Sequence, residues 1–126
     1  MPTLQIKTIS DAVEIQEVVV PLIKKVYFAS GYLLDRDEFF EPTKFLVSAD
    51  TTVLGAFLDD RLVGTLSCIQ DGTLGLPIDV YYKDVTDQFR SENESMLELS
   101  QFAVDEDLVR ELDDRTISPR IGLCLL

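Results

Sequence analysis

The chain has 126 residues, enough for one domain with a substantial core (residues 1–126) and too few for two. Its composition, 46% hydrophobic and 27% charged, is that of an ordinary globular protein. Twenty-three acidic against 11 basic residues give a net charge of −12, which argues against binding to nucleic acid or to an anionic membrane surface. Five cations can still gather at one binding mouth: Lys24, Lys25, Arg110, Arg115 and Arg120.

The chain contains no histidine, and its two cysteines, Cys68 and Cys124, share no short spacing. This argues against the usual zinc sites and excludes a Ser-His or Cys-His nucleophile pair, so no metal ligand is predicted. The N-terminus lacks a basic segment followed by an apolar run, and no apolar stretch approaches the roughly 20 residues that span a bilayer. We therefore expect no signal peptide, no transmembrane segment and a cytoplasmic location with reduced thiols.

The first third of the chain predicts a strand followed by a helix. Residues 4–9 alternate loosely between apolar and polar side chains, which is typical of a short strand. Ser10 or Asp11 then caps a helix, in which apolar side chains recur at helical spacing over residues 15–27. Pro21 lies inside this pattern and removes a backbone hydrogen bond, so we expect a kink or a split into two helices there.

A polar connection at residues 35–42 contains Asp37 and two aromatic side chains, Phe39 and Phe40. Such a loop often lies over a binding site. Its aromatic side chains belong either to the core or a lid, or to the contacts with a substrate. Asp37 is either a solvated loop acid or a substrate contact.

The middle of the chain predicts a β-hairpin. Residues 53–58 and 61–69 are rich in β-forming side chains, and only Asp59-Asp60 separates them. Before the hairpin, the apolar residues 45–47 predict a short strand or the approach to one. The hairpin is the clearest pair of strands in the sequence.

Five elements are predicted after the hairpin: a loop with glycine and proline, a short surface helix, a strand, one or two helical turns, and the start of a last helix. They occupy, in order, residues 71–77, 83–91, 96–104, 107–114 and 118–126. The strand contains Glu98 in an apolar run that looks buried, and a buried carboxylate must be paired, hydrogen-bonded or used. The order of elements predicts an α+β fold, with a mostly antiparallel sheet flanked by helices.

Three segments resemble one protein family. Glu98-Leu99-Ser100-Gln101-Phe102-Ala103-Val104 resembles the fourth strand of the GNAT superfamily, in the branch of N-acyl amino acid synthases and acyl-homoserine-lactone (autoinducer) synthases. Gly75-Leu76-Pro77-Ile78-Asp79 resembles the segment that precedes this strand, and Leu62-Val63-Gly64-Thr65-Leu66 resembles the third strand. The resemblance covers residues 4–126 and implies an α/β sandwich of GNAT type. The chain stops soon after the third helix begins, so we expect the C-terminal half of such a domain to be missing.

The resemblance implies transfer of an acyl group from a thioester donor, carried on acyl carrier protein (acyl-ACP) or coenzyme A (acyl-CoA), to an amine such as an amino acid. In such enzymes the amine attacks the thioester directly, so no covalently bound cofactor is implied. Glu98 matches the family's acid and is the candidate base, acting directly or through water, or else orienting the amine by its charge. Backbone amides of a bulged strand at Phe102, Ala103 and Val104 are the candidate oxyanion donors.

The resemblance also implies substrate contacts, for which the candidates are Asp37, Phe39, Phe40, Ser100 and Gln101. Three positions depart from the family pattern. Gln101 and Ser67 stand where arginines are usual, and Phe40 stands where the autoinducer synthases carry a second aspartate. These differences argue against the autoinducer reaction and for a different amine.

Two alternatives concern the chain as a whole. The diphosphate-binding pattern of members that use coenzyme A is absent, which favours a carrier-protein donor. The missing arginines and the early end also leave open a catalytically inactive, truncated GNAT-like module that binds a ligand or a partner. Residues 121–126 are mostly apolar, so a homodimer that covers this end is a further expectation.

Overall fold

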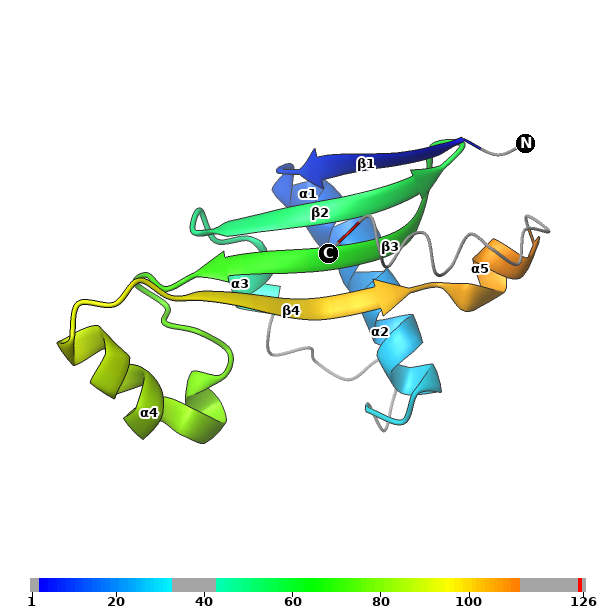
Figure 1. Cartoon of the computed structure of the whole chain (residues 1–126). Helices are drawn as coiled ribbons and strands as arrows, with labels where there is room; N and C mark the ends of the chain where they lie inside the picture. Colours follow the sequence, from blue (N-terminus) through cyan, green and yellow to red (C-terminus); the bar gives the residue numbers. More distant parts are fainter. Residues whose placement is uncertain (1–2, 33–42, 112–124, 126) are drawn as a thin grey trace.

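The computed structural model describes residues 3–32, 43–111 and 125. Four strands form one antiparallel sheet in the order β1-β2-β3-β4, with helices around it (Figure 1). The strands are β1 (Leu4–Ile9), β2 (Thr51–Leu58), β3 (Arg61–Gln70) and β4 (Leu97–Val104). The helices are α1 (Ala12–Glu14), the π-helix η1 (Ile15–Val19), α2 (Val20–Ala29), α3 (Thr43–Leu46), α4 (Asp79–Ser91) and α5 (Glu106–Glu111). The predicted α+β class, with an antiparallel sheet flanked by helices, is confirmed.

The first helix is capped by Asp11, whose side chain accepts a hydrogen bond of 2.9 Å from the Val13 N–H. Between α1 and α2 the chain passes through the π-helical turn η1, in which the Val20 N–H donates to the Ile15 carbonyl five residues back. Pro21 follows directly and has no N–H to donate. The expected irregularity at Pro21 therefore takes the form of a wider helical turn, so the helical path continues into α2.

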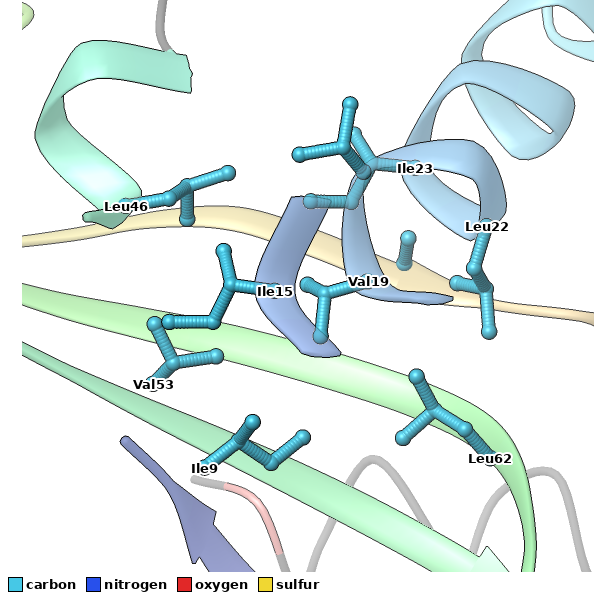
Figure 2. Packing of buried hydrophobic residues seen from close by; sticks show 10 residues of the cluster. Ile9, Ile15, Val19, Leu22, Ile23, Leu46, Val53 and Leu62 are labelled. Atoms are coloured by element: carbon cyan, nitrogen blue, oxygen red, sulfur yellow. The ribbon is translucent and has the colours of Figure 1, made fainter. Parts of the chain in front are cut away.

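The core lies on both faces of the two central strands, β2 and β3. On one face, side chains of η1, α2 and α3 pack against the sheet (Figure 2). This cluster comprises Ile9, Ile15, Val19, Val20, Leu22, Ile23, Leu46, Val53, Leu62 and Ala103. The opposite face holds a second cluster, formed by Ala56, Leu58, Val63, Leu66, Val109 and Leu125. Leu125, from the apolar C-terminal run, is thus covered by the chain's own sheet.

The hairpin of β2 and β3 is confirmed, and its turn has positive φ at both central residues, 48° at Asp59 and 69° at Asp60. This is the backbone of a type I′ turn, in which aspartate is tolerated. The short strand expected at residues 45–47 is wrong, because the chain forms the helical turn α3 there. Phe45 and Leu46 are both buried, and a strand would point these neighbours to opposite faces.

The later elements lie close to their predicted positions. The helix expected at residues 83–91 begins earlier, at Asp79, and bends at Tyr82, whose φ of −134° and ψ of 35° are not helical. The helical turns expected at residues 107–114 are α5, and residues 112–114 lie outside the described part of the chain. The last predicted helix, from residue 118, falls almost entirely outside it as well.

Strand β4 is one of the two edge strands of the sheet that the described residues form, opposite β1 (Figure 1). Leu97, Leu99 and Phe102 are 56%, 54% and 44% exposed. The expectation of a buried strand is therefore wrong for one face of β4. An apolar sequence shows that both faces of a strand are apolar, but it does not show that both are covered.

Candidate functional site

Strand β4 carries a β-bulge in its middle. Residues 100 and 103 pair with β3, and between them Gln101 and Phe102 face the single residue Leu66. Gln101 has φ of +57°, a left-handed conformation that is uncommon for a residue other than glycine. Bulges interrupt the ladder of hydrogen bonds, and they are over-represented next to active sites. The bulged strand that the family resemblance implies is thus present at this position.

One hydrogen bond fixes the directions of the amides that follow the bulge in β4. The Asp105 N–H donates to the Val63 carbonyl of β3 at 2.8 Å. Because N–H directions alternate along a regular antiparallel strand, the Ala103 N–H also points to β3, whereas that of Val104 points to the outer edge. Phe102 lies in the bulge itself, where this alternation is broken. Within the described residues no further strand pairs with that edge. Of the three predicted oxyanion donors, the Val104 N–H therefore faces this edge.

Two polar side chains near the bulge are buried without a hydrogen-bond partner among the described residues. Gln101 is 5% exposed with both side-chain amide atoms unpaired, and Ser67 is fully buried with an unpaired Oγ. Leaving such a group unpaired costs about 1–3 kcal/mol. Unpaired buried groups require an explanation, and a binding site that a ligand completes is one. These are the two positions at which the family resemblance leads us to expect arginines.

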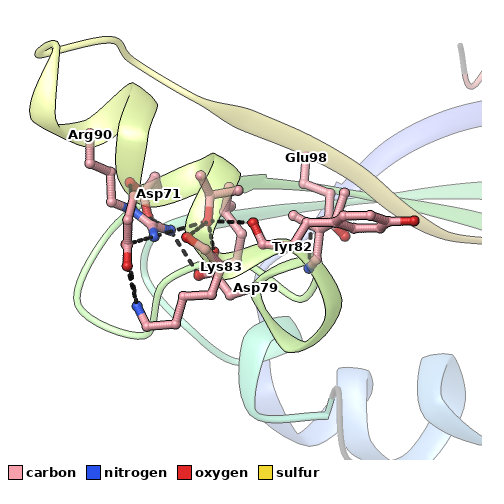
Figure 3. A network of polar contacts seen from close by, with 10 residues as sticks. Asp71, Asp79, Tyr82, Lys83, Arg90 and Glu98 are labelled. Atoms are coloured by element: carbon pink, nitrogen blue, oxygen red, sulfur yellow. Dashed lines mark hydrogen bonds and ion pairs between the residues drawn. The ribbon is translucent and has the colours of Figure 1, made fainter.

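Glu98 lies three residues before the bulge and is half-buried. Its Oε1 accepts a hydrogen bond of 2.9 Å from the Ile78 N–H, at the start of α4 (Figure 3). The first amides of a helix have no partner within the helix, and the helix dipole favours a negative charge at this end. Among the described residues, Ile78 is the single hydrogen-bond donor to this carboxylate. One oxygen of Glu98 is thus fixed and the other is available.

The other predicted site residues divide into two groups. Ser100 is half-buried and shares a face of β4 with Glu98, because side chains two residues apart in a strand lie on the same face. The fold thus gathers Glu98, Ser100, Gln101 and the bulge amides on one strand. Asp37, Phe39 and Phe40 lie outside the described residues, so their substrate contacts stay predictions.

Sequence analysis missed Arg90, which connects three aspartates (Figure 3). Its Nε and Nη2 bind the two carboxylate oxygens of Asp71 at 2.7 and 2.9 Å. Nη2 also binds Asp79 at 2.8 Å, and Nη1 binds Asp87 at 2.7 Å. The helical i,i+3 spacing of Asp87 and Arg90 was the only signal in the sequence. The contacts to Asp71 and Asp79 depend on the fold.

The aspartate at the start of α4 is held in its charged form. Partial burial of Asp79 raises its pKa, but hydrogen bonds from Arg90, Thr86 and the Leu76 N–H outweigh this and hold the pKa well below its ordinary value. The hydrogen bonds to Asp71, Asp79 and Asp87 in turn raise the pKa of Arg90 further above its ordinary value. Asp79 and Arg90 are therefore both charged at neutral pH.

The C-terminal end of β4 is tied to α2 by an ion pair. Lys25 Nζ lies 2.9 Å from both carboxylate oxygens of Asp105. Lys25 and Arg110, two of the five cations expected to gather, line one cleft of about 240 Å³ together with Asp105 and Asp107. Cations and carboxylates therefore both line this cleft, and the charge of Lys25 is paired with that of Asp105.

The described residues contain no group of three or more His, Cys, Asp or Glu side chains placed to hold a metal ion. The three aspartates of the Arg90 cluster surround the guanidinium instead. None of the helices in this part of the chain is long and apolar enough to cross a membrane.

An antiparallel sheet with a bulged fourth strand, and with the first helices on one face, defines a domain of GNAT type. Residues 19–117 match the family described as N-acyl amino acid synthase FeeM, and the chain belongs to this family. The solved structure of FeeM, an N-acyl amino acid synthase from uncultured soil microbes, is similar with a TM-score of 0.78 at 26% sequence identity. The similarity covers 99% of this chain and 64% of the FeeM chain. A search of curated proteins found no match.

Proposed function

We propose that this chain is an N-acyltransferase that moves an acyl group from a thioester to an amine such as an amino acid. Its membership of the FeeM family supports this class of reaction. The observation that carries the proposal is local to β4. An available carboxylate oxygen on Glu98, the bulge at Gln101 and Phe102, and the edge-facing amide of Val104 lie within seven positions of one strand.

In the proposed reaction, the amine nitrogen attacks the thioester carbonyl carbon and forms the new C–N bond. The attacking amine enters as an ammonium and must lose a proton, which Glu98 Oε2 accepts directly or through a water molecule. Because the Ile78 N–H fixes Oε1, the carboxylate is oriented before the amine arrives. Glu98 carries the proton-transfer role, and its charge also attracts the ammonium.

The carbonyl oxygen becomes negative as the C–N bond forms. The N–H groups of Phe102 and Val104 are the proposed donors to this oxyanion, and the ladder bond assigned to Ala103 makes it the weakest of the three candidates. The C–S bond then breaks, and the leaving thiolate takes up one of the two protons that the ammonium loses on becoming an amide, while the other proton is released to solvent. The products are an amide, a free thiol and one proton, so the reaction needs no further reactant.

Gln101 and Ser100 are the proposed polar contacts with the acceptor. The Gln101 side chain offers an unpaired carbonyl oxygen and an unpaired NH₂ group, both buried. An amide at this position can both donate to and accept from the acceptor, whereas an arginine can only donate. Asp37, Phe39 and Phe40 are proposed to contact the substrate from the preceding loop.

The donor is either acyl-ACP or acyl-CoA. The lack of the diphosphate-binding sequence pattern favours the carrier protein. Lys25 and Arg110, in the cleft at the end of β4, are proposed to contact an acidic carrier. This donor implies a cytoplasmic protein. Residues 1–126 are proposed to form the N-terminal part of a single GNAT-like acyltransferase domain.

The test is to incubate the purified chain with acyl-ACP or acyl-CoA and a panel of amino acids and other amines, and to search for amides by mass spectrometry. We expect amide formation with at least one amino acid and faster turnover with acyl-ACP. Thioester binding without any amide would instead favour the alternative, a GNAT-like module that binds its ligand without chemistry. Equal rates with both donors would contradict the carrier preference alone.

A further inference from the structure

Helix α4 is held in place almost entirely by polar contacts. Of its residues only Thr86 is buried, and the apolar side chains of Tyr82, Val85 and Phe89 are 57%, 46% and 46% exposed. Burial of apolar area therefore does little to fix this helix. Yet its first turn provides the Ile78 N–H that binds Glu98. The contacts that orient this turn accordingly decide where the Glu98 carboxylate is held.

The first turn of α4 is closed by Asp79. Asp79 Oδ2 accepts a hydrogen bond of 2.8 Å from the Leu76 N–H, three residues earlier, and this bond closes the turn that leads into α4. Pro77, between them, has no N–H. Of the amides in this turn, that of Leu76 is therefore used by Asp79, and that of Ile78 binds Glu98. The direction of the Ile78 N–H depends on this turn.

Arg90 fixes Asp79 from the other end of the helix. Its Nη2 binds Asp79 Oδ2 at 2.8 Å, while the same guanidinium grips both oxygens of Asp71. The Thr86 hydroxyl holds the second oxygen of Asp79. Asp71 directly follows β3 and donates its N–H to the Met96 carbonyl, just before β4. Arg90 thus connects the first turn of α4 to the two strands that carry the site.

We propose that Arg90 is a positioning residue for Glu98. Arg90 holds Asp79, Asp79 holds the turn at residues 76–79, and the Ile78 N–H of that turn holds Glu98 Oε1. This inference rests on the proposed role of Glu98 as the base. Arg90 touches no reacting atom, and it acts by keeping the carboxylate in one orientation before the amine arrives.

A positioning role for Arg90 and a purely stabilising role have different measurable effects. A residue that only stabilises the fold changes the amount of active protein, and it does so whether residue 98 is Glu or Gln. A residue that acts through Glu98 loses its effect on turnover when the Glu98 carboxylate is absent, because the two changes remove one function. A double-mutant cycle of Arg90→Gln and Glu98→Gln distinguishes the two cases.

The kinetic arm measures amide formation by both single variants and the double variant, corrected for the folded fraction. We expect Arg90→Gln to lower kcat roughly 10- to 100-fold with KM changed less than about twofold. In the Glu98→Gln background the same change should alter kcat less than about twofold. An equal loss in both backgrounds overturns the positioning role. A Glu98→Gln variant that keeps full turnover instead overturns the proposed role of Glu98 as the base, on which this inference rests.

The second arm does not need activity. Amide hydrogen exchange of Ile78, followed by NMR, reports whether its N–H is still bound. We expect Arg90→Gln to speed this exchange roughly tenfold or more, as loss of a charge-assisted hydrogen bond would. Unchanged exchange at Ile78 overturns the mechanical link, even if the chain shows no turnover with any substrate.

Two further variants control the experiment. Lys83→Gln removes the exposed Lys83–Asp87 pair of the same helix and leaves the turn at residues 76–79 intact. It should change neither kcat nor Ile78 exchange by more than about twofold. Asp79→Asn replaces Arg90→Gln where the latter fails to fold, because it keeps the side-chain shape and removes the charge. It should reproduce both effects in smaller size, and no change in either would overturn the inference.

Discussion

Helices α2 and α4 are held to the rest of the domain by different forces. Helix α2 buries Val20, Leu22 and Ile23 in the cluster that covers one face of the sheet. Helix α4 buries only Thr86, and charged side chains fix its position. Apolar burial is strong but non-directional, whereas hydrogen bonds fix an orientation. The comparison suggests that α2 mainly stabilises the sheet, and α4 mainly orients the Glu98 end of β4.

The largest effect on stability is expected for Ile23→Ala in α2. Ile23 is fully buried in the core cluster, so its truncation leaves a cavity. We expect a loss of about 2–5 kcal/mol in the free energy of unfolding, measured with urea, and about 0.5–1.5 kcal/mol for the control Ile23→Val. The exchange of the Ile78 amide under native conditions should be unaffected by Ile23→Val. A large change in the exchange of the Ile78 amide would contradict the proposal that α2 and α4 have separate roles.

A smaller loss is expected at the other end of β4, for Asp105→Ala. Asp105 is 9% exposed, pairs with Lys25 and accepts the Leu108 N–H at 3.2 Å at the start of α5. Loss of the ion pair and the cap together should cost about 1–3 kcal/mol in urea unfolding. Asp107→Ala is the matched control, since this residue lies 3.9 Å from Lys25 and is 69% exposed. Equal losses for the two variants would contradict a specific role for Asp105.

A third effect concerns pH and sharpens the description of α4. The pKa of Asp79 is lowered in the folded state, so the folded chain binds this proton more weakly than the unfolded chain does. The contribution of Asp79 to stability is therefore fully present above its ordinary value of 3.8 and is lost as the pH falls below it. The wild-type chain should lose stability more steeply below that pH than Asp79→Asn. Parallel curves would show that the network contributes little.

The smallest effect is expected for Lys83→Gln. The Lys83–Asp87 pair lies on the surface of α4, with side chains 67% and 50% exposed. Its removal should lower the free energy of unfolding by about 0.3–0.5 kcal/mol, and added salt should reduce the difference further. A loss as large as that of Asp105→Ala would mean that surface charges, rather than the Arg90 cluster, hold α4.

Much of the fold is predictable from local patterns. The hairpin follows from two β-rich runs with two residues between them, and the first helix follows from its apolar spacing. The short apolar run at residues 45–47 led to the wrong prediction of a strand, because three apolar residues fit a strand and a helical turn equally well. The exposure of one face of β4 was not predicted for a related reason. The sequence shows that the side chains on a face are apolar, but it does not show whether another element packs over them.

The site was only partly predictable. Glu98 was found because a carboxylate in an apolar strand needs an explanation, and the bulge followed from the family resemblance alone. The hydrogen bond from Ile78 to Glu98 joins residues 20 positions apart. The pair of Arg90 and Asp71 spans 19 positions. No local spacing predicts such contacts, because they exist only after α4 folds back beside the end of β3.

The most direct test of the central claim is the turnover of Glu98→Gln with an acyl thioester and an accepted amine. Gln keeps the size of the side chain and can still accept the Ile78 N–H, but it cannot take a proton from the ammonium. If Glu98 is the base, kcat should fall about 10²- to 10⁴-fold, while the unfolding curve stays within about 1 kcal/mol of wild type. Unchanged amide formation by a folded Glu98→Gln variant would contradict the account.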